Sequence, residues 1–192
     1  SKEDVMTEIS ELDSKKSGTF MNIPVKVLKD TKEDIADTLV KIWKEEILEK
    51  RNFAAELKRA DITPLHKKLE HIFKGNYRPV SLLPIVSKIF ERIMLKQMKP
   101  FIETFLSKWL CGYRKGFNAQ YALLAMIERM KKSLDNKGLF AAVLMDLSKA
   151  FDTINHELLI AKLEAYGFGE SALEIVLSYL SDRWHMGGIN KW

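Results

Sequence analysis

The feature that most constrains the fold is an uninterrupted apolar run, residues 139–145, that ends in the acidic side chain of Asp146. The run reads Leu-Phe-Ala-Ala-Val-Leu-Met, shows no helical periodicity and follows a turn-forming Asp-Asn-Lys-Gly segment. A run of this length and composition predicts a β-strand that is buried on both faces. We therefore expect a sheet in this chain, with Asp146 at the end of one of its strands.

Elsewhere, apolar residues recur at helical spacing. Thr31, with Asp34 three residues later, predicts a capping-box-like helix start, and Asn118 predicts a second N-cap. Pro100 should break or kink one helix, and Gly167 should end another. The predicted helices cover residues 1–12, 31–47, 85–98, 118–134, 156–166 and 170–180.

Two segments should be extended. Residues 62–65 suit a short edge strand, because Pro64 cannot donate a hydrogen bond to a central ladder. Residues 76–84 should also be extended, because residues before prolines avoid the helical region. A loop or hairpin tip should join them over 66–75, and the tail from 183 to 192 has no clear period. Helices and strands without regular alternation predict an α+β fold.

Composition narrows the class of protein. The apolar fraction of 46% and the charged fraction of 30% are typical of a globular protein. The net charge of +5 favours a polyanionic partner such as nucleic acid. A single cysteine, Cys111, excludes an internal disulfide and favours a reducing compartment. We expect an intracellular location, in the cytoplasm and nucleus. No apolar run reaches membrane-spanning length, so we expect no membrane partner.

Asp146 is the first candidate for chemistry. An ionised carboxylate at the end of a buried strand needs a cationic partner, and a divalent metal would also stabilise phosphoryl charge. Alternatively, Asp146 caps the following turn or pairs with Lys149. Phe151 and Asp152 follow closely in the sequence. Without a functional role, Phe151 would be a core aromatic and Asp152 would be a helix N-cap.

Three motifs, in order, carry a resemblance to a known family. Residues 143–156, which contain Ala-Phe-Asp-Thr-Ile-Asn-His, resemble the first palm motif of reverse transcriptases of non-LTR (LINE-like) retrotransposons. Residues 76–83, Asn-Tyr-Arg-Pro-Val-Ser-Leu-Leu, resemble the fingers motif of that family, and residues 111–116 resemble its Gly-aromatic-Arg-Lys-Gly segment. The upstream residues 11–68 are also similar to the segment that precedes the fingers. The resemblance fades after about residue 183.

The resemblance implies a role for each palm residue. Asp146 would be the first catalytic carboxylate and a ligand of the two Mg²⁺ ions (or Mn²⁺) of phosphoryl transfer. The backbone carbonyl of Leu147 would be a further metal ligand. Phe151 would be the steric gate, whose ring would clash with a 2′-hydroxyl and so favour dNTPs.

The resemblance also implies roles for basic residues. Arg78 would face the incoming triphosphate, which a planar guanidinium suits. Arg114 and Lys115 would line the backbone of an RNA template and DNA primer, and Lys67 and Lys68 would do likewise. The alternatives are a surface arginine for Arg78 and a solvated basic turn for the two lysines at 67 and 68.

The resemblance further implies three domains: a helical segment over 1–58, helix-rich fingers over 59–138, and an incomplete palm over 139–192. The chain contains no Asp-Asp pair and no Pro-Gln-Gly turn, both of which the palm of the family carries later. Asn118 also stands where the family has a hydroxyl residue. We therefore expect a fragment of a right-hand polymerase that is inactive alone, and whose partners include the missing C-terminal palm and thumb.

Two other functions remain open from the sequence. One is a degenerate nucleic-acid-binding or interaction module without catalysis. The other is an unrelated phosphoryl-transfer enzyme that uses Asp146 and Asp152, which would need a further acidic cluster nearby in space.

Overall fold

The computed structural model describes residues 1–14, 23–67, 70–147, 150–151 and 153–187. The chain forms two compact units, which are described separately below. Unit 1 comprises Ser1–Met98 together with Asn155–Trp192, and unit 2 comprises Lys99–Ile154. The division of the chain into fingers and palm made above is a different one, and it stays a prediction.

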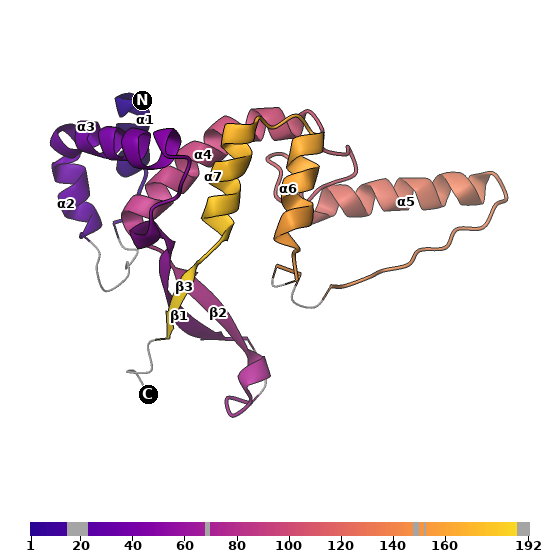
Figure 1. Cartoon of the computed structure of the whole chain (residues 1–192). Coiled ribbons are helices and arrows are strands. Elements are labelled where there is room, and N and C mark those ends of the chain that lie inside the picture. The colour runs from indigo at the N-terminus through magenta and orange to yellow at the C-terminus, as the bar shows by residue number, and fades with distance from the viewer. Residues whose placement is uncertain (15–22, 68–69, 148–149, 152, 188–192) are drawn as a thin grey trace. The chain divides into compact units, whose positions relative to one another are not determined.

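Unit 1 begins with short helices (Figure 1). The Ser1 side chain and Asp4 form a capping box at the start of α1, Lys2–Ser10. The helix α2 covers Val25–Asp30, and α3, Lys32–Ile42, continues as the π-helix η1, Trp43–Glu49. The expected capping box at Thr31 is wrong, because its hydroxyl donates to the Val27 carbonyl of the preceding helix at 2.8 Å.

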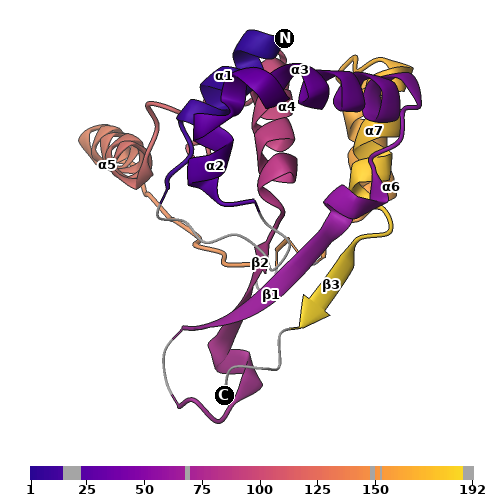
Figure 2. The ribbon, with the colours of Figure 1, turned by 90° about the vertical axis from the view of Figure 1, so that its left-hand side faces the viewer.

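A three-stranded sheet follows in the order β2-β1-β3 (Figure 2). The 3-10 turn η2, Ala55–Lys58, leads into β1, Arg59–His66, which pairs antiparallel with β2, Tyr77–Leu82. The 3-10 turn η3, Lys74–Asn76, precedes β2. The strand β3, Trp184–Gly187, pairs parallel with β1 and was not predicted, because its sequence has no strand-like pattern.

The expectation that Pro64 marks an edge strand is wrong, because β1 lies between its two neighbours. Its pairing with β3 extends only from Arg59 to Ile62, whereas its pairing with β2 extends to His66. Among the described residues, Pro64 pairs with Pro79 of β2, and β3 as described ends at Gly187, opposite Ile62.

Three longer helices lie between β2 and β3 in the sequence and belong wholly or mainly to unit 1. The helix α4, Ile85–Glu103, passes through Pro100 rather than stopping there, although the boundary between the units falls just before it, at Met98. The helices α6, His156–Ala165, and α7, Glu170–Leu180, agree with the prediction. Gly167, at φ 91°, ends α6 as expected, with its N–H donating to Glu164 and that of Phe168 donating to Leu163.

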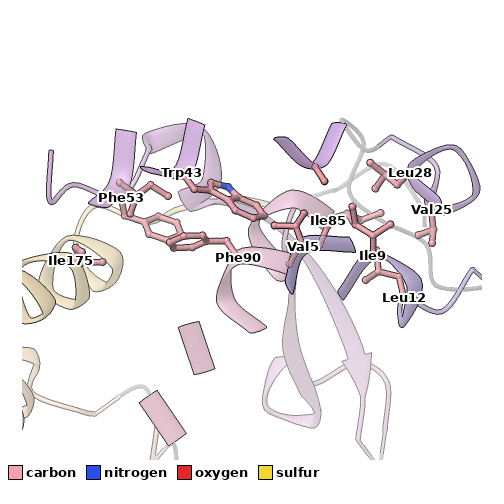
Figure 3. Close-up of a cluster of buried hydrophobic side chains, with 13 residues drawn as sticks. Val5, Ile9, Leu12, Val25, Leu28, Trp43, Phe53, Ile85, Phe90 and Ile175 are labelled. Atoms are coloured by element: carbon pink, nitrogen blue, oxygen red, sulfur yellow. The ribbon is translucent and has the colours of Figure 1, made fainter. Parts of the chain in front are cut away.

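The hydrophobic core lies in unit 1 (Figure 3). Phe90 packs against Trp43 and Phe53, with ring centroids 5.2 Å and 5.6 Å apart, and Phe53 meets Tyr179 edge-on at 5.1 Å. Each such pair contributes about 0.5–1.5 kcal/mol beyond its buried area. The buried apolar residues of this cluster are Val5, Ile9, Leu12, Val25, Leu28, Ala36, Trp43, Ile47, Phe53, Ile85, Ile89, Phe90 and Ile175.

Two polar groups are held at this core. The Glu8 side chain is 1% exposed and pairs with Lys96 and, at 3.5 Å, with Arg92 on α4. The Ser178 hydroxyl on α7 accepts hydrogen bonds from the Phe53 N–H at 2.9 Å and from Lys58 at 3.3 Å. These contacts join α1 to α4 and α7 to the segment that leads into β1.

Unit 2 contains α5, Ala119–Asp135, and an extended segment without strand pairing over 139–147. No residue of this unit that the structure describes is buried. The prediction of a strand buried on both faces is therefore wrong: Leu139 is 99% exposed, Val143 83% and Leu144 90%. A strand needs neighbours to satisfy its backbone and cover its side chains, and the described part of this chain supplies none at this segment.

Candidate functional site

Asp146 lies at the end of the exposed extended segment, in unit 2. Its side chain is exposed, and Leu147 beside it is 77% exposed. Across the described ranges, no group of three or more His, Cys, Asp or Glu side chains could hold a metal ion. The described residues therefore offer a single carboxylate here and do not complete a divalent-metal site. Lys149, the alternative partner of Asp146, and Asp152 lie outside the described residues.

Phe151 is an exposed side chain, at 72%, rather than a core aromatic. Its ring meets the ring of Tyr113 edge-on, with the centroids 6.3 Å apart and the planes at 82°. Tyr113 belongs to the Gly-aromatic-Arg-Lys-Gly segment and adopts φ 59°. Two of the three sequence motifs, distant in the chain, thus come into contact within unit 2.

Arg114 is the best-anchored side chain of this loop, at 13% exposed. Its guanidinium donates from Nε to Glu103 at 2.9 Å, and its second nitrogen lies 2.8 Å from the same carboxylate oxygen. The third nitrogen donates to the backbone carbonyls of Ser107 at 3.0 Å and Leu110 at 3.4 Å. The guanidinium also lies 4.5 Å from the Phe117 ring centre. Arg114 therefore holds the loop together, a role that the sequence reasoning missed.

Lys115 is exposed beside Arg114, and the helix that follows starts as expected. The Asn118 side chain accepts a hydrogen bond from the Tyr121 N–H at 2.9 Å, so Asn118 is confirmed as the N-cap of α5. Phosphate contacts from Arg114 and Lys115 stay a prediction, and Lys115 has the more accessible of the two cationic groups.

A cluster of cations around Trp109 was also missed. The Arg129 guanidinium lies 3.8 Å from the Trp109 ring centre, and the Lys108 ammonium lies 5.1 Å from it. A shallow cavity of about 260 Å³ lies beside them, between α5 and the extended segment, and Tyr121 and Phe140 contribute to its lining. The signal in the sequence was weak, because these residues are 20 positions apart and match none of the three motifs.

Arg78 and Lys67 belong to unit 1, on the β1–β2 hairpin. Arg78 is exposed on β2 opposite Leu65 of β1, and no carboxylate pairs with its guanidinium among the residues described. Lys67 is exposed where the hairpin turns, and its backbone N–H donates to Asn76 at 2.7 Å. Lys68 lies outside the described residues.

In the ranges that the structure covers, none of the helices combines the length and the apolarity that crossing a bilayer requires.

Comparison with known proteins agrees with the motifs. Residues 65–192 match the family described as reverse transcriptase (RNA-dependent DNA polymerase). A probable RNA-directed DNA polymerase from transposon BS of Drosophila melanogaster is 29% identical over 185 residues, which cover 94% of this chain and 20% of that protein. The probable RNA-directed DNA polymerase from transposon X-element of the same species is 30% identical over 84 residues, 43% of this chain and 9% of that protein.

A third relative is the RNA-directed DNA polymerase from mobile element jockey of Drosophila melanogaster, 28% identical over 112 residues. Those residues cover 56% of this chain and 12% of that protein. The chain thus spans about a fifth, or less, of the length of these relatives. The resemblance to reverse transcriptases of non-LTR retrotransposons and the α+β fold are both confirmed.

Proposed function

The chain belongs to the reverse transcriptase (RNA-dependent DNA polymerase) family, and on that premise we propose that it supplies the fingers and the first palm carboxylate of an enzyme that copies RNA into DNA. The observation that carries the proposal is the family match over residues 65–192, which includes the fingers, loop and palm motifs. The intact enzyme would extend a DNA primer on an RNA template with dNTPs.

Asp146 is the proposed metal ligand of this chain. A divalent cation, Mg²⁺ in our proposal, would neutralise the phosphoryl charge that develops during nucleotide addition. The exposed carboxylate of Asp146 and the backbone carbonyl of Leu147 are oxygen donors of the kind that such cations prefer. Because the chain lacks an Asp-Asp pair, these two donors leave most of the coordination shell unfilled, and the chain alone should not catalyse synthesis.

Phe151 is the proposed determinant of sugar selectivity. An aromatic ring beneath the sugar excludes a 2′-hydroxyl by steric overlap, and this hydroxyl is what separates RNA precursors from DNA precursors. The edge contact with Tyr113 supports this role, because it restricts where the exposed Phe151 ring can lie.

The basic residues are the proposed binding groups. Arg78 has an exposed guanidinium without a carboxylate partner among the described residues, which suits the triphosphate of a nucleotide. Lys115 and Lys67 are exposed ammonium groups that suit the backbone of the template and primer. Arg114 would act on the same backbone chiefly by holding the loop that presents Lys115.

A binding assay tests this proposal on the chain as it stands. The chain should bind an RNA–DNA hybrid, and the logarithm of its affinity should fall linearly with the logarithm of salt concentration. Lys115→Gln should lower the magnitude of that slope by about 0.7–0.9, the value for one phosphate contact. Lys26→Gln is the matched control, because Lys26 is also an exposed lysine, lies on α2 and is outside the proposed site.

Binding that is absent at low salt, or that does not depend on salt, would refute the proposal. Equal slopes for the Lys115 and Lys26 variants would remove Lys115 from the site. The missing Asp-Asp pair also favours a second candidate, a nucleic-acid-binding module that never catalyses. That candidate predicts the same hybrid binding but no gain in affinity from a matching dNTP, whereas the Arg78 site predicts such a gain.

A further inference from the structure

The extended segment 139–147 of unit 2 has no strand beside it among the described residues. The Ser133 hydroxyl of α5 donates to the Leu139 carbonyl at 2.9 Å, which ties the start of the segment to that helix. An extended apolar segment with open edges is a template for pairing with a further strand. Five of its apolar side chains are each at least 77% exposed: Leu139, Val143, Leu144, Met145 and Leu147.

The helix α5 lies beside this segment. Tyr121 and Met126 of α5 line a cavity of about 260 Å³, and Phe140 and Val143 of the segment line the same cavity. A pair of strands alone is only marginally stable, whereas a pair that packs against a helix is better supported. The helix is therefore in place to support a strand pair that this segment forms.

The segment is self-complementary when two copies run antiparallel. A twofold axis at Val143 places that residue opposite Val143 of the second copy. Leu139 then faces Leu147 of the second copy, and Ala141 likewise faces Met145. Because alternate side chains of a strand share a face, all of these residues lie on one face, and that face is apolar throughout in both copies.

Charge favours the antiparallel pair over a parallel one. Asp146 is the one charged residue of segment 139–147. In the antiparallel pair Asp146 faces Phe140 of the second copy, so the two carboxylates lie about 20 Å apart along the strands, well beyond the Debye length of about 8 Å. In a parallel pair in register, the two Asp146 residues would be neighbours at about 5 Å, where like charges are destabilising.

The exposed apolar area sets the strength of such a pair. Burying an aliphatic side chain of this size removes about 60–120 Å² from water, so five of them supply roughly 300–600 Å² per copy. Two copies together would bury roughly 600–1,200 Å², which is the size of a weak, transient interface rather than of an obligate one. We therefore expect a dissociation constant of about 1–100 μM.

We propose that two copies of this chain form a twofold-symmetric dimer by antiparallel pairing of their segments 139–147, centred on Val143. An antiparallel pair uses the same surface in both copies, so the assembly closes at two chains. Below about 1 μM the chain is a monomer with the segment exposed, as the structure shows it. The inference goes beyond the proposed function and does not require nucleic acid.

Sedimentation velocity of the purified chain, from about 0.5 to 500 μM, tests the inference. The sedimentation coefficient should rise with concentration from that of a monomer to that of a dimer and stop there. Amide hydrogen exchange gives a local readout on the same samples. Amides of residues 139–147 should be unprotected in the dilute monomer and become protected in the concentrated dimer, because half of them then bond to the second copy.

Charged variants test the position of the axis. Val143→Lys should raise the dissociation constant at least about tenfold, because each copy loses an apolar contact and faces a like charge. Val143→Asp should do the same alone, whereas an equimolar mixture of the two variants should restore the dimer, because opposite charges then face each other. Ile72→Lys is the matched control: Ile72 is 86% exposed in unit 1, and this variant should dimerise within about threefold of the wild-type chain.

A chain that stays monomeric up to about 500 μM would overturn the inference and leave the missing part of the palm as the occupant of this segment. Growth beyond the dimer would overturn it as well, because the proposed pair is closed. Equal weakening by Val143→Lys and Ile72→Lys, or a mixture of the Lys and Asp variants that stays monomeric, would exclude the axis at Val143. Hybrid binding by the chain is measured separately, so failure of the proposed function and failure of this inference are distinguishable.

Discussion

Replacement of Leu144 by alanine gives the sharpest test of the exposed segment over 139–147. In the structure Leu144 is 90% exposed, so its truncation removes almost no buried area and should change the free energy of unfolding by less than about 0.5 kcal/mol. If the segment were instead a strand buried on both faces, the same truncation would cost about 2–5 kcal/mol. The two arrangements thus differ by a measurable amount at a single side chain.

Urea unfolding followed by circular dichroism measures this difference. Ile89→Ala is the positive control, because Ile89 is 0% exposed in the core of unit 1 and its truncation should cost about 2–5 kcal/mol. Amide hydrogen exchange on the monomeric chain adds a local readout: the amides of residues 139–147 should exchange without protection, since they pair with no described strand. A loss of 2 kcal/mol or more in Leu144→Ala, or strong amide protection in this segment, would refute the reasoning.

Three further perturbations have definite outcomes. Asn118→Ala removes the cap of α5 and should cost about 1 kcal/mol, visible as faster amide exchange in the first turn of that helix, whereas Asn118→Ser should restore most of it. Arg114→Ala should lose about 1.5–3 kcal/mol of local stability around the loop, measured by protease sensitivity, and Glu103→Gln should reproduce part of that loss. Burial, with the charge of Glu91 second, raises the pKa of Tyr179 from 10.0 to about 12. Its contribution to stability should therefore be complete below pH 10 and be lost as the pH rises from about 10 to 12, and Tyr179→Phe should flatten this alkaline fall in Tm.

Local patterns predicted the helices well. Asn118 caps α5 and Gly167 ends α6 because a short polar side chain and a residue tolerant of positive φ satisfy helix ends in any context. The predicted capping box at Thr31 was wrong for a local reason too. The Thr31 hydroxyl donates to a carbonyl of the preceding helix, α2, which the sequence signals only weakly. Helix ends that depend on a few neighbouring residues can therefore be predicted from the sequence. Such a prediction is wrong where an adjacent element competes for the same side chain.

The sheet was less predictable, because strand pairing depends on residues far apart in the chain. Pro64 wrongly indicated an edge position for β1, since the second neighbour, β3, comes from a tail whose sequence has no strand pattern. The run 139–145 has the composition of a buried strand, yet burial needs partners, and composition alone cannot show whether the chain supplies them.

The candidate site was likewise predicted only in part from the sequence. Recognition of ordered motifs identified the family and the residues to test, including Asp146 and Arg78. It did not reveal that the guanidinium of Arg114 is engaged by Glu103 and two backbone carbonyls, because motifs record residue types and not contacts.

Primer extension by the purified chain tests the central claim most directly, namely that the chain supplies one part of a reverse transcriptase site without completing it. The assay uses an RNA template, a labelled DNA primer, dNTPs and Mg²⁺, with an intact reverse transcriptase as the positive control. The account predicts hybrid binding without extension, because Asp146 has no Asp-Asp pair to complete the metal site. Mg²⁺-dependent extension that Asp146→Asn abolishes would contradict it.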